Sequence, residues 1–294
     1  MRVFLTGATG YIGTVVAERL AAAGHQLSAL ARSDSAAARL SLAGVRPVPG
    51  DLDDPLVIAR AAAAADGVIS MATTYDAKVD GPAVDAILGA LEGSGKPYLF
   101  TSGIWSQGDT GGAVVDETTP TRPFAHAAWR KPIEDRVRQA AQRQVRSVDI
   151  RPGIVYGRAG GIPAGFTESA RKDGAARFVG SGENRWAMVH LDDLADLYLL
   201  ALERAPAGVL LLAVSGPAHP VKELAAAASR GAGAGGRTSS WPLDEARAAL
   251  GSYADALVLD QQASGQRAEQ LLGWRPHQPG PIEELERGSY AARS

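Results

Sequence analysis

The most constraining feature of this chain is a glycine-rich turn near its N-terminus, set between a short apolar run and a helical pattern. Val3 to Leu5 is apolar throughout, Gly7, Gly10 and Gly13 follow at intervals of three, and residues 14–24 form a helical pattern closed by a glycine. A tight turn of this kind lets a ligand approach the backbone, and the free N–H groups of the helix start point at a phosphate. The arrangement predicts a buried strand, a dinucleotide-binding turn and a helix.

Strands and helices alternate along the rest of the chain. We expect further strands over 25–33, 45–49, 67–74, 97–102, 147–150 and 208–214, and helices over 34–42, 55–65, 79–92, 126–144 and 193–203. This alternation predicts an α/β fold in which helices cover both faces of a doubly wound parallel sheet, the Rossmann arrangement. We assign residues 1–155 and 188–215 to this dinucleotide-binding domain, and residues 156–187 and 216–294 to a smaller α/β substrate-binding part.

Composition narrows the classes of partner. The 294 residues are 46% hydrophobic and 21% charged, with a formal net charge of −2, and they include no cysteine. The chain lacks the excess of basic residues that is typical of nucleic-acid-binding proteins. Its apolar runs are all shorter than the ~20 residues of a membrane span, and the absence of cysteine excludes thiolate metal sites. The sequence contains no other metal-ligating cluster, so we expect no metal. The chain enters a core strand at once, which leaves no room for a signal peptide, and we expect a cytoplasmic protein.

The end of the second strand bears on the choice of cofactor. An acidic residue at this place pairs with the ribose 2′-hydroxyl of NAD, whereas an arginine accommodates the 2′-phosphate of NADP. Arg32 and Ser33 stand here, a guanidinium beside a hydroxyl, and they favour NADP over NAD. Asp34 would serve NAD if the strand ended later. After the third strand, Asp51 and Leu52 are expected to bind and cover the adenine, although Asp51 is also a suitable cap for the next helix.

These residues and several later motifs resemble the extended short-chain dehydrogenase/reductases, and the resemblance covers nearly the whole chain. The matching motifs are Gly7-x-x-Gly10-x-x-Gly13, Asp51-Leu52, Thr101-Ser102-Gly103, Arg151-Pro152-Gly153-Ile154-Val155-Tyr156-Gly157, Val189-His190-Leu191-Asp192-Asp193-Leu194-Ala195 and Leu272-Gly273-Trp274-Arg275-Pro276. The resemblance implies a nicotinamide cofactor whose ring lies against the loop from Pro152 to Val155. We expect the cofactor to contact Gly7, Thr9, Gly10, Tyr11, Ile12, Gly13, Arg32, Ser33, Asp51, Leu52, Ala72, Thr73, Thr101, Arg130, Pro152, Gly153, Ile154 and Val155.

The catalytic motif of that family is incomplete in this chain. The family has a serine or threonine after the fifth strand and a Tyr-x-x-x-Lys motif on the next helix, where the tyrosine moves the proton and the lysine binds the nicotinamide ribose. Ser102 occupies the serine position. In the family a glutamate often lies four residues beyond the lysine, and Glu134 lies four residues beyond Arg130. In this register His126 replaces the tyrosine and Arg130 replaces the lysine.

Three interpretations of this replacement stay open. In the first, His126 is the acid or base and Arg130 holds the ribose hydroxyls. In the second, Tyr75 at the end of the fourth strand supplies the proton, and Lys131 can serve instead, as lysines do in atypical members of the family that lack the tyrosine. In the third, the hydride chemistry is lost, and the fold survives as a sensor or for redox-neutral chemistry.

The function expected from these observations is that of an NADP-dependent oxidoreductase acting on a small organic carbonyl, alcohol or conjugated double bond. The alternatives are a catalytically silent NADP-binding sensor or partner protein, and a redox-neutral epimerase, dehydratase or cyclase. Family members commonly dimerise through helices that correspond to 79–92 and 126–144, but the second of these is heavily charged here. We therefore expect a monomer or weak homodimer.

Several other side chains allow both structural and functional interpretations. The motif around His190 is expected to position a helix cap, and Asp192, Asp193 and Asp196 are expected to serve the helix dipole rather than a metal. Arg158 is expected to be a solvated surface residue. Four rings either line a pocket for a flat organic substrate or pack in the core: Trp105, Trp129, Trp186 and Phe166.

Overall fold

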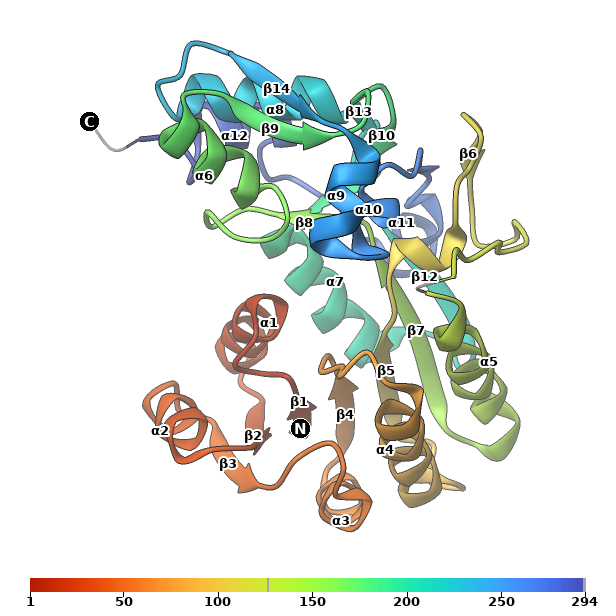
Figure 1. Cartoon of the computed structure of the whole chain (residues 1–294). Helices are drawn as coiled ribbons and strands as arrows, with labels where there is room; N and C mark the ends of the chain where they lie inside the picture. Colours follow the sequence, from red (N-terminus) through yellow and green to blue (C-terminus); the bar gives the residue numbers. More distant parts are fainter. Residues whose placement is uncertain (126, 293–294) are drawn as a thin grey trace.

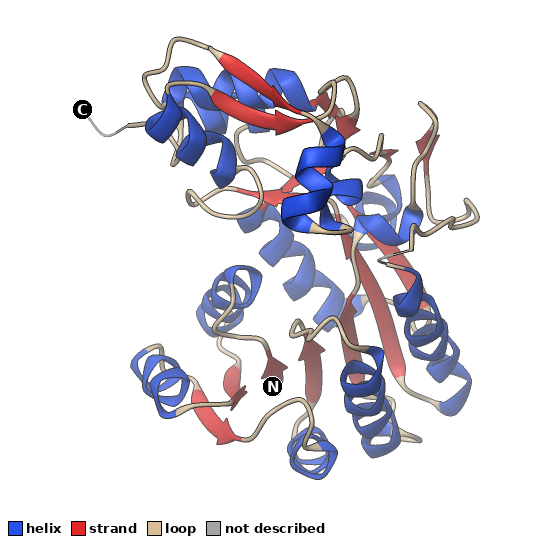
Figure 2. Ribbon diagram, in the orientation of Figure 1, coloured by secondary structure: helices blue, strands red, loops and turns tan. Residues whose placement is uncertain are grey.

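A seven-stranded parallel sheet forms the centre of the molecule (Figures 1 and 2), whose computed structural model describes residues 1–125 and 127–292. The strand order is β12-β7-β5-β4-β1-β2-β3, and every neighbouring pair is parallel. These strands are β1 Arg2–Thr6, β2 Gln26–Ala31, β3 Arg46–Pro49, β4 Gly67–Ser70, β5 Pro97–Thr101, β7 Arg146–Pro152 and β12 Val209–Ala213. The order reverses between β1 and β4, where this class of sheet binds its ligands. The prediction of a doubly wound parallel sheet is confirmed.

Helices cover both faces of this sheet. One face carries α1 (Tyr11–Ala22), α2 (Asp34–Leu42), α7 (Leu191–Arg204) and α11 (Gln266–Leu272), and the other carries α3 (Pro55–Ala64), α4 (Ala77–Leu91) and α5 (Lys131–Gln139). The side chains of β1 alternate accordingly. Val3 and Leu5 belong to the core under α1 and α7, whereas Phe4 belongs to the core under α3 and α4. Burial on both faces explains why the run is continuously apolar.

The smaller part of the molecule lies over the carboxyl ends of the central strands (Figure 1). Its helices are α6 (Ala164–Asp173), α8 (Val221–Gly231), α9 (Leu243–Leu250), α10 (Tyr253–Leu257) and α12 (Pro281–Arg287). The remaining short strands pair two by two: β8 (Ile154–Tyr156) with β11 (Met188–His190), β9 (Ala176–Val179) with β14 (Thr238–Trp241), β10 (Arg185–Trp186) with β13 (His219–Pro220), and β6 (Val114–Val115) with β15 (Gln262–Ala263). Among the described helices, none combines the length and apolarity that crossing a bilayer requires.

Most elements lie within a few residues of their predicted bounds, and two differ more clearly. The helix expected over 126–144 is divided in its described part, because a 3₁₀ turn (Ala128–Arg130) precedes α5 and another (Ala140–Arg143) follows it. Pro132 lies in the first turn of α5, where its missing N–H suits a helix start rather than a helix interior. The fourth strand ends at Ser70 rather than at residue 74, because the side chains of Thr73 and Thr74 bind Asp80 instead of continuing the ladder.

Candidate active site

The glycine turn between β1 and α1 is tight, and its glycines serve different purposes. Gly7 has a φ of +79°, and a Cβ atom there would lie 2.7 Å from the backbone nitrogen of Ala72. A Cβ atom at Gly13 would lie 2.0 Å from the carbonyl oxygen of Gly7, so the helix start packs directly on the turn. Gly10 is exposed and begins α1 with no side chain capping the helix. The open side of the turn therefore presents backbone alone.

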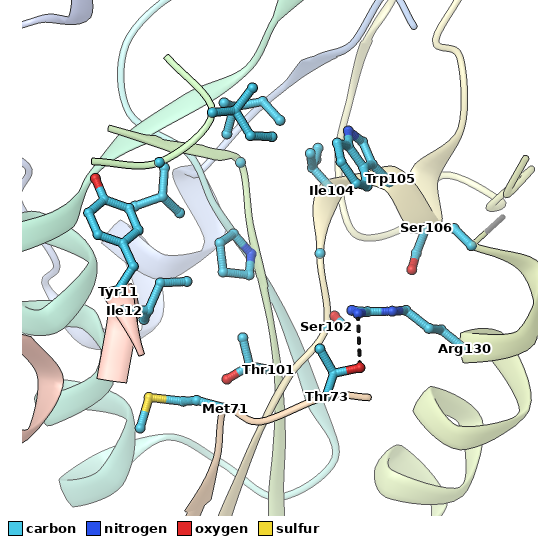
Figure 3. Close-up of a pocket in the computed structure, with 18 of the residues that line it drawn as sticks. Tyr11, Ile12, Met71, Thr73, Thr101, Ser102, Ile104, Trp105, Ser106 and Arg130 are labelled. Carbon is cyan, nitrogen blue, oxygen red and sulfur yellow. Dashed lines mark hydrogen bonds between the residues drawn. The ribbon is translucent and has the colours of Figure 1, made fainter. Parts of the chain in front are cut away.

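Tyr11 joins this turn to the smaller part of the molecule. Its hydroxyl donates to the carbonyl oxygen of Gly157 at 2.7 Å, and its ring fills the space beside Gly160, where a Cβ atom would lie 2.4 Å from the ring. Burial, together with neighbouring Tyr290, raises the pKa of Tyr11 above its usual range. Tyr11 is therefore a neutral hydrogen-bond donor, and next to it Ile12 reaches the same cavity (Figure 3).

A cavity of about 330 Å³ lies between the glycine turn, the carboxyl ends of the central strands and the smaller part (Figure 3). Apolar side chains and backbone form most of its wall, with several hydroxyl groups and one guanidinium among them. The lining residues are Tyr11, Ile12, Met71, Thr73, Tyr75, Thr101, Ser102, Gly103, Ile104, Trp105, Ser106, Ala127, Arg130, Pro152, Gly153, Ile154, Val155, Gly161 and Ile162. The loop predicted to meet the nicotinamide and the candidate catalytic residues Tyr75, Ser102 and Arg130 thus come together in one place.

Arg130 brings a positive charge into this cavity. Its guanidinium carbon lies 5.3 Å from the centroid of the Tyr75 ring and 5.1 Å from that of Trp129. Its Nη2 atom donates to Thr73 Oγ1 at 3.5 Å (Figure 3). Within residues 1–125 and 127–292, no carboxylate forms an ion pair with it. A Cβ atom at Gly103 would lie 3.9 Å from Arg130 Nη1, so position 103 of the loop after β5 faces the cation.

The Ser102 hydroxyl is directed toward a buried carboxylate. It donates to Asp149 Oδ1 at 2.5 Å and approaches the carbonyl oxygen of Ile150 at 3.3 Å. Asp149 lies on β7, is fully buried and also accepts a hydrogen bond from Arg138 at 2.9 Å. Burial and the charge of Glu134 raise the pKa of Asp149 to about 6, against the opposing effect of nearby cations. The Ser102 hydroxyl is therefore already engaged at the base of the cavity.

A buried ion pair lies next to Asp149. Arg151 Nη2 donates to Glu134 Oε2 at 2.6 Å, and each side chain is 1% exposed. The same two residues hold the segment after β5, because Ser106 donates to Glu134 at 2.5 Å and Arg151 donates to Gln107 at 2.7 Å. These bonds fix a 3₁₀ turn (Ile104–Gln107) that forms one wall of the cavity.

Several residues around the cavity lie outside the set predicted from the sequence. Ile104, Ser106 and Ile162 line it, and no local pattern marks them, because they arrive from segments far apart in the chain. The buried ion-pair network did have a signal in the sequence. Asp149 and Arg151 are charged residues beside the buried Val148 and Ile150 of β7, and charges in a strand buried on both faces require partners.

An exposed arginine stands at the carboxyl end of β2. Arg32 follows the strand directly, is exposed, and forms no hydrogen bond or ion pair with any described residue. The Ser33 hydroxyl accepts the N–H of Ala36 at 3.2 Å and so caps α2. Asp34 is the first residue of that helix, so β2 does not extend to it.

At the end of β3, the Asp51 carboxylate accepts the N–H of Leu52 at 2.7 Å. It does not cap the next helix, because Asp54 does so by accepting the N–H of Val57. Leu52 is buried, and Thr9 lines a separate hollow between α1 and α2. Asp51 itself is exposed, beyond the end of the edge strand β3.

Two further predicted cofactor residues lie on the neighbouring strand ends. The N–H of Ala72 donates to Thr6 Oγ1 at 3.4 Å, which fixes the chain after β4 against β1. The Thr101 hydroxyl lies 2.5 Å from that of Tyr198 on α7, so this side chain is fixed where β5 meets the cavity.

The three candidates for proton transfer are placed differently. Tyr75 lines the cavity and adopts a φ of 61°, a conformation that non-glycine residues seldom take. Lys131 does not line the cavity, because its ammonium group pairs with Asp135 at 2.8 Å on the surface of α5. The structure thus gives no support to Lys131 as the catalytic group. His126 lies outside the described residues.

The predicted helix cap is confirmed. His190 is the N-cap of α7, and its Nδ1 atom accepts the backbone N–H two residues further on at 3.2 Å. Asp193, Asp196 and His277 bring three potential metal-ligating atoms within 4.8 Å of one another. Asp193 nevertheless accepts the backbone N–H of His277 at 3.0 Å, and Asp196 pairs with Arg19 at 2.5 Å, so protein groups already satisfy both carboxylates.

Comparisons with known proteins agree with this arrangement. The model of the NAD dependent epimerase/dehydratase family matches residues 3–211. An uncharacterised protein of Schizosaccharomyces pombe, C2A9.02, is 31% identical over 309 residues, which cover 99% of this chain and 100% of that protein. A 2-alkyl-3-oxoalkanoate reductase of Stenotrophomonas maltophilia is 28% identical over 248 residues, which cover 76% of this chain and 73% of the reductase.

A solved structure supports the fold. The UDP-glucose 4-epimerase of Thermotoga maritima superimposes with a TM-score of 0.82 at 19% identity, over 99% of this chain and 97% of the epimerase. The shared architecture therefore includes the smaller part as well as the central sheet.

Proposed function

The chain belongs to the NAD-dependent epimerase/dehydratase family, and on that premise we propose that it is an NADP-dependent oxidoreductase acting on a small organic carbonyl, alcohol or conjugated double bond. The observation that carries the proposal is the cavity, which joins the glycine turn, the loop Pro152 to Val155 and the Arg130 guanidinium within one volume of about 330 Å³. In this proposal the cofactor lies across residues 1–155 and 188–215, while 156–187 and 216–294 enclose the substrate, with the exception of α11, which covers the central sheet.

The residues present fit a dinucleotide. Gly7 and Gly13 close the turn where any Cβ atom would collide with backbone, and the exposed Gly10 adds no side chain on the outer side. The first turn of α1 has no side-chain cap and no acidic residue, so its N–H groups and helix dipole favour a pyrophosphate there. Pro152 to Val155 would face the nicotinamide, which supplies a hydride when the cofactor is bound.

The choice of NADP over NAD rests on Arg32 at the carboxyl end of β2. The strand ends at Ala31, so Arg32 occupies the place where the 2′-substituent of the adenosine ribose is read. Its guanidinium has no partner among the described residues and matches a phosphate in charge and geometry. Asp34 lies two residues further along, at the start of α2, where it also complements the helix dipole.

Two side chains carry the chemistry in this proposal. Arg130 donates hydrogen bonds from its five N–H groups to the ribose hydroxyls of the cofactor and to the oxygen atom of the substrate. Tyr75 donates the proton to the carbonyl oxygen, or accepts it from an alcohol, because its ring lies in the cavity beside the Arg130 cation. His126 is the alternative donor from the register of the motif. Reduction is favoured over epimerisation by the similarity to a 2-alkyl-3-oxoalkanoate reductase.

The test is a panel of ketones, aldehydes and enones incubated with the protein and followed through the absorbance of NADPH. We expect substrate-dependent oxidation of NADPH by at least one conjugated carbonyl. A different observation favours the sensor: the Ser102 hydroxyl donates its hydrogen bond to Asp149 and not into the cavity. Tight NADPH binding without turnover of any substrate would support the sensor and contradict the oxidoreductase.

A further inference from the structure

A second cavity, of about 440 Å³, adjoins the first one within the smaller part of the molecule. Residues of α6, β9, β14 and α10 surround it, and Ile162 lines both cavities. The walls also meet through Trp105 of the first cavity and Tyr253 of the second, whose rings contact edge to face with centroids 5.6 Å apart. Ile162 and this pair of rings therefore lie between the two cavities.

Aromatic rings dominate the second cavity. Phe166 and Trp186 are stacked, with centroids 5.6 Å and planes 18° apart, and the indole N–H of Trp186 donates to the carbonyl oxygen of Leu257 at 3.3 Å. Because that polar atom is already bonded, the ring offers apolar surface to the cavity. Three more rings line the same space: Phe178, Trp241 and Tyr253.

The charged side chains at this cavity balance one another. Glu168 and Asp173 are opposed by Lys172 and Arg177, and the Arg177 guanidinium lies 4.5 Å above the ring of Trp241. A diphosphate or another strongly anionic group would meet two carboxylates here, with no excess of cations to hold it. The walls instead fit a neutral, planar, apolar group, which can pack against the rings.

We propose that the two cavities form one substrate site, with a carbonyl or enone head in the first and an aromatic tail in the second. The substrate class is then an aryl-substituted ketone or enone. This assignment rests on the proposed function, because the head group is placed by the chemistry argued for the first cavity. Ile162, which is shared by both cavities, marks the point where head and tail join.

Gly165 offers a way to fill the second cavity without disturbing the fold. It lies on α6, lines the cavity and is exposed, and a Cβ atom there would meet nothing within 4 Å. Gly165→Phe therefore adds a ring at the wall of the cavity. Gly89→Phe is the matched control, because Gly89 lies exposed on α4, away from both cavities, with equally open space around its Cβ position. Leu250→Trp narrows the same cavity from α9 and serves as a second variant.

Binding is measured by calorimetry on protein saturated with NADP⁺, which cannot donate a hydride. The probes are mesityl oxide, an enone without a ring, and the biphenyl analogue of benzalacetone, a similar head with two rings. We expect the unmutated protein and Gly89→Phe to bind the biphenyl probe about ten-fold or more tightly than mesityl oxide. Gly165→Phe and Leu250→Trp should lose most of that preference, while their thermal unfolding stays cooperative.

Equal affinities for the two probes in the unmutated protein would overturn the proposal, as would an undiminished preference in both cavity-filling variants. Oxidation of NADPH by the same probes is recorded separately. Ring-dependent binding without any oxidation would leave the second cavity established and would count against the oxidoreductase. Reduction of mesityl oxide by NADPH, without tighter binding of the ringed probe, would support the oxidoreductase and count against the second cavity.

Discussion

Arg130 is the residue on which the proposed chemistry depends most. Its neighbours Arg138 and Arg151 are paired with Asp149 and Glu134, whereas Arg130 meets aromatic rings and a threonine hydroxyl. Since no carboxylate among the described residues pairs with Arg130, this half-buried cation loses hydration that its surroundings restore only in part. Such a charge is suited to receive oxygen atoms of a ligand, and an arginine cannot itself serve as a base.

Loss of the proton donor should remove catalysis while cofactor binding remains. Tyr75→Phe should slow carbonyl reduction by about 10²–10⁴-fold, because the ring beside Arg130 is kept and only the hydroxyl is lost. Steady-state rates and NADPH affinities of this variant are compared with those of Lys131→Ala, a control whose ammonium group pairs with Asp135 and should not matter. Full activity in Tyr75→Phe, with the loss found in His126→Ala instead, would assign the proton to the histidine.

Arg32 should determine the preference for NADP over NAD. A charge-assisted contact with phosphate is worth roughly 1.5–3 kcal/mol, so Arg32→Ala should lower the affinity for NADP by about ten-fold or more and leave that for NAD nearly unchanged. Calorimetric titration with both cofactors measures this. Arg46→Ala is the control, because it removes another exposed charge, from the far end of the neighbouring strand β3. Equal affinities for NAD and NADP in the unmutated protein would refute the assignment.

At the scale of elements, β7 carries a titrating carboxyl in the middle of the sheet. The pKa of Asp149 is raised from 3.8 to about 6 by burial and by the charge of Glu134. Between these values the unfolded chain releases its proton while the folded chain keeps it, so the free energy of unfolding falls as the pH rises. The stabilising contribution is thus complete below about pH 4 and lost above about pH 6.

Asp149→Asn should abolish this part of the pH dependence. The variant's free energy of unfolding, minus that of the unmutated protein, should increase by on the order of 2 kcal/mol as the pH rises from about 4 to about 7. Urea denaturation at several pH values measures the difference. The comparison cancels the other carboxylates, such as Asp66, whose pKa is lowered and whose effect has the opposite sign. A difference that does not vary with pH would contradict the account.

The same elements show what local pattern can predict. The continuous apolar run of β1 and the glycines after it reflect burial on both faces and close backbone contacts, so the sequence predicts both features. The direction of the Ser102 hydroxyl cannot be predicted in this way, because its partner Asp149 lies 47 residues further along the chain. The interruption before α5 was marked locally by Pro132, but the periodicity around it concealed the break.

At the scale of the whole molecule, a few polar contacts tie the two parts together around the cavity. Arg158 is exposed, as expected of a surface residue, and it also pairs with Glu18 of α1 and with Asp192 of α7, each at 2.6 Å. Tyr290 near the C-terminus donates to the carbonyl oxygen of Gly160 at 2.6 Å. These contacts bring the smaller part against the glycine turn, which is why the cavity is shared between distant segments. No local sequence pattern specifies such contacts.

The molecule should be a monomer or a weak dimer. Among the described residues, none of the exposed large apolar side chains lies on α4 or α5, and their charges pair within the chain, as in the contact of Arg136 with Asp85 at 3.0 Å. A stable interface over these helices would need more exposed apolar surface. Sedimentation at nanomolar to micromolar concentration should give a mass close to the 30.5 kDa of one chain. A dimer that persists at nanomolar concentration would contradict this expectation.

Hydride transfer itself is the most direct test of the proposed function. The protein is incubated with NADPH carrying deuterium at both positions of the nicotinamide C4 and with the biphenyl analogue of benzalacetone, and the products are analysed by mass spectrometry. We predict a reduced product that contains one deuterium, formed by the unmutated protein and absent with Arg130→Met, which keeps an unbranched stem but removes the charge and the N–H donors. Saturable NADPH binding with no deuterium in any product, from this probe or from the wider carbonyl panel, would contradict the oxidoreductase and leave a cofactor-binding sensor.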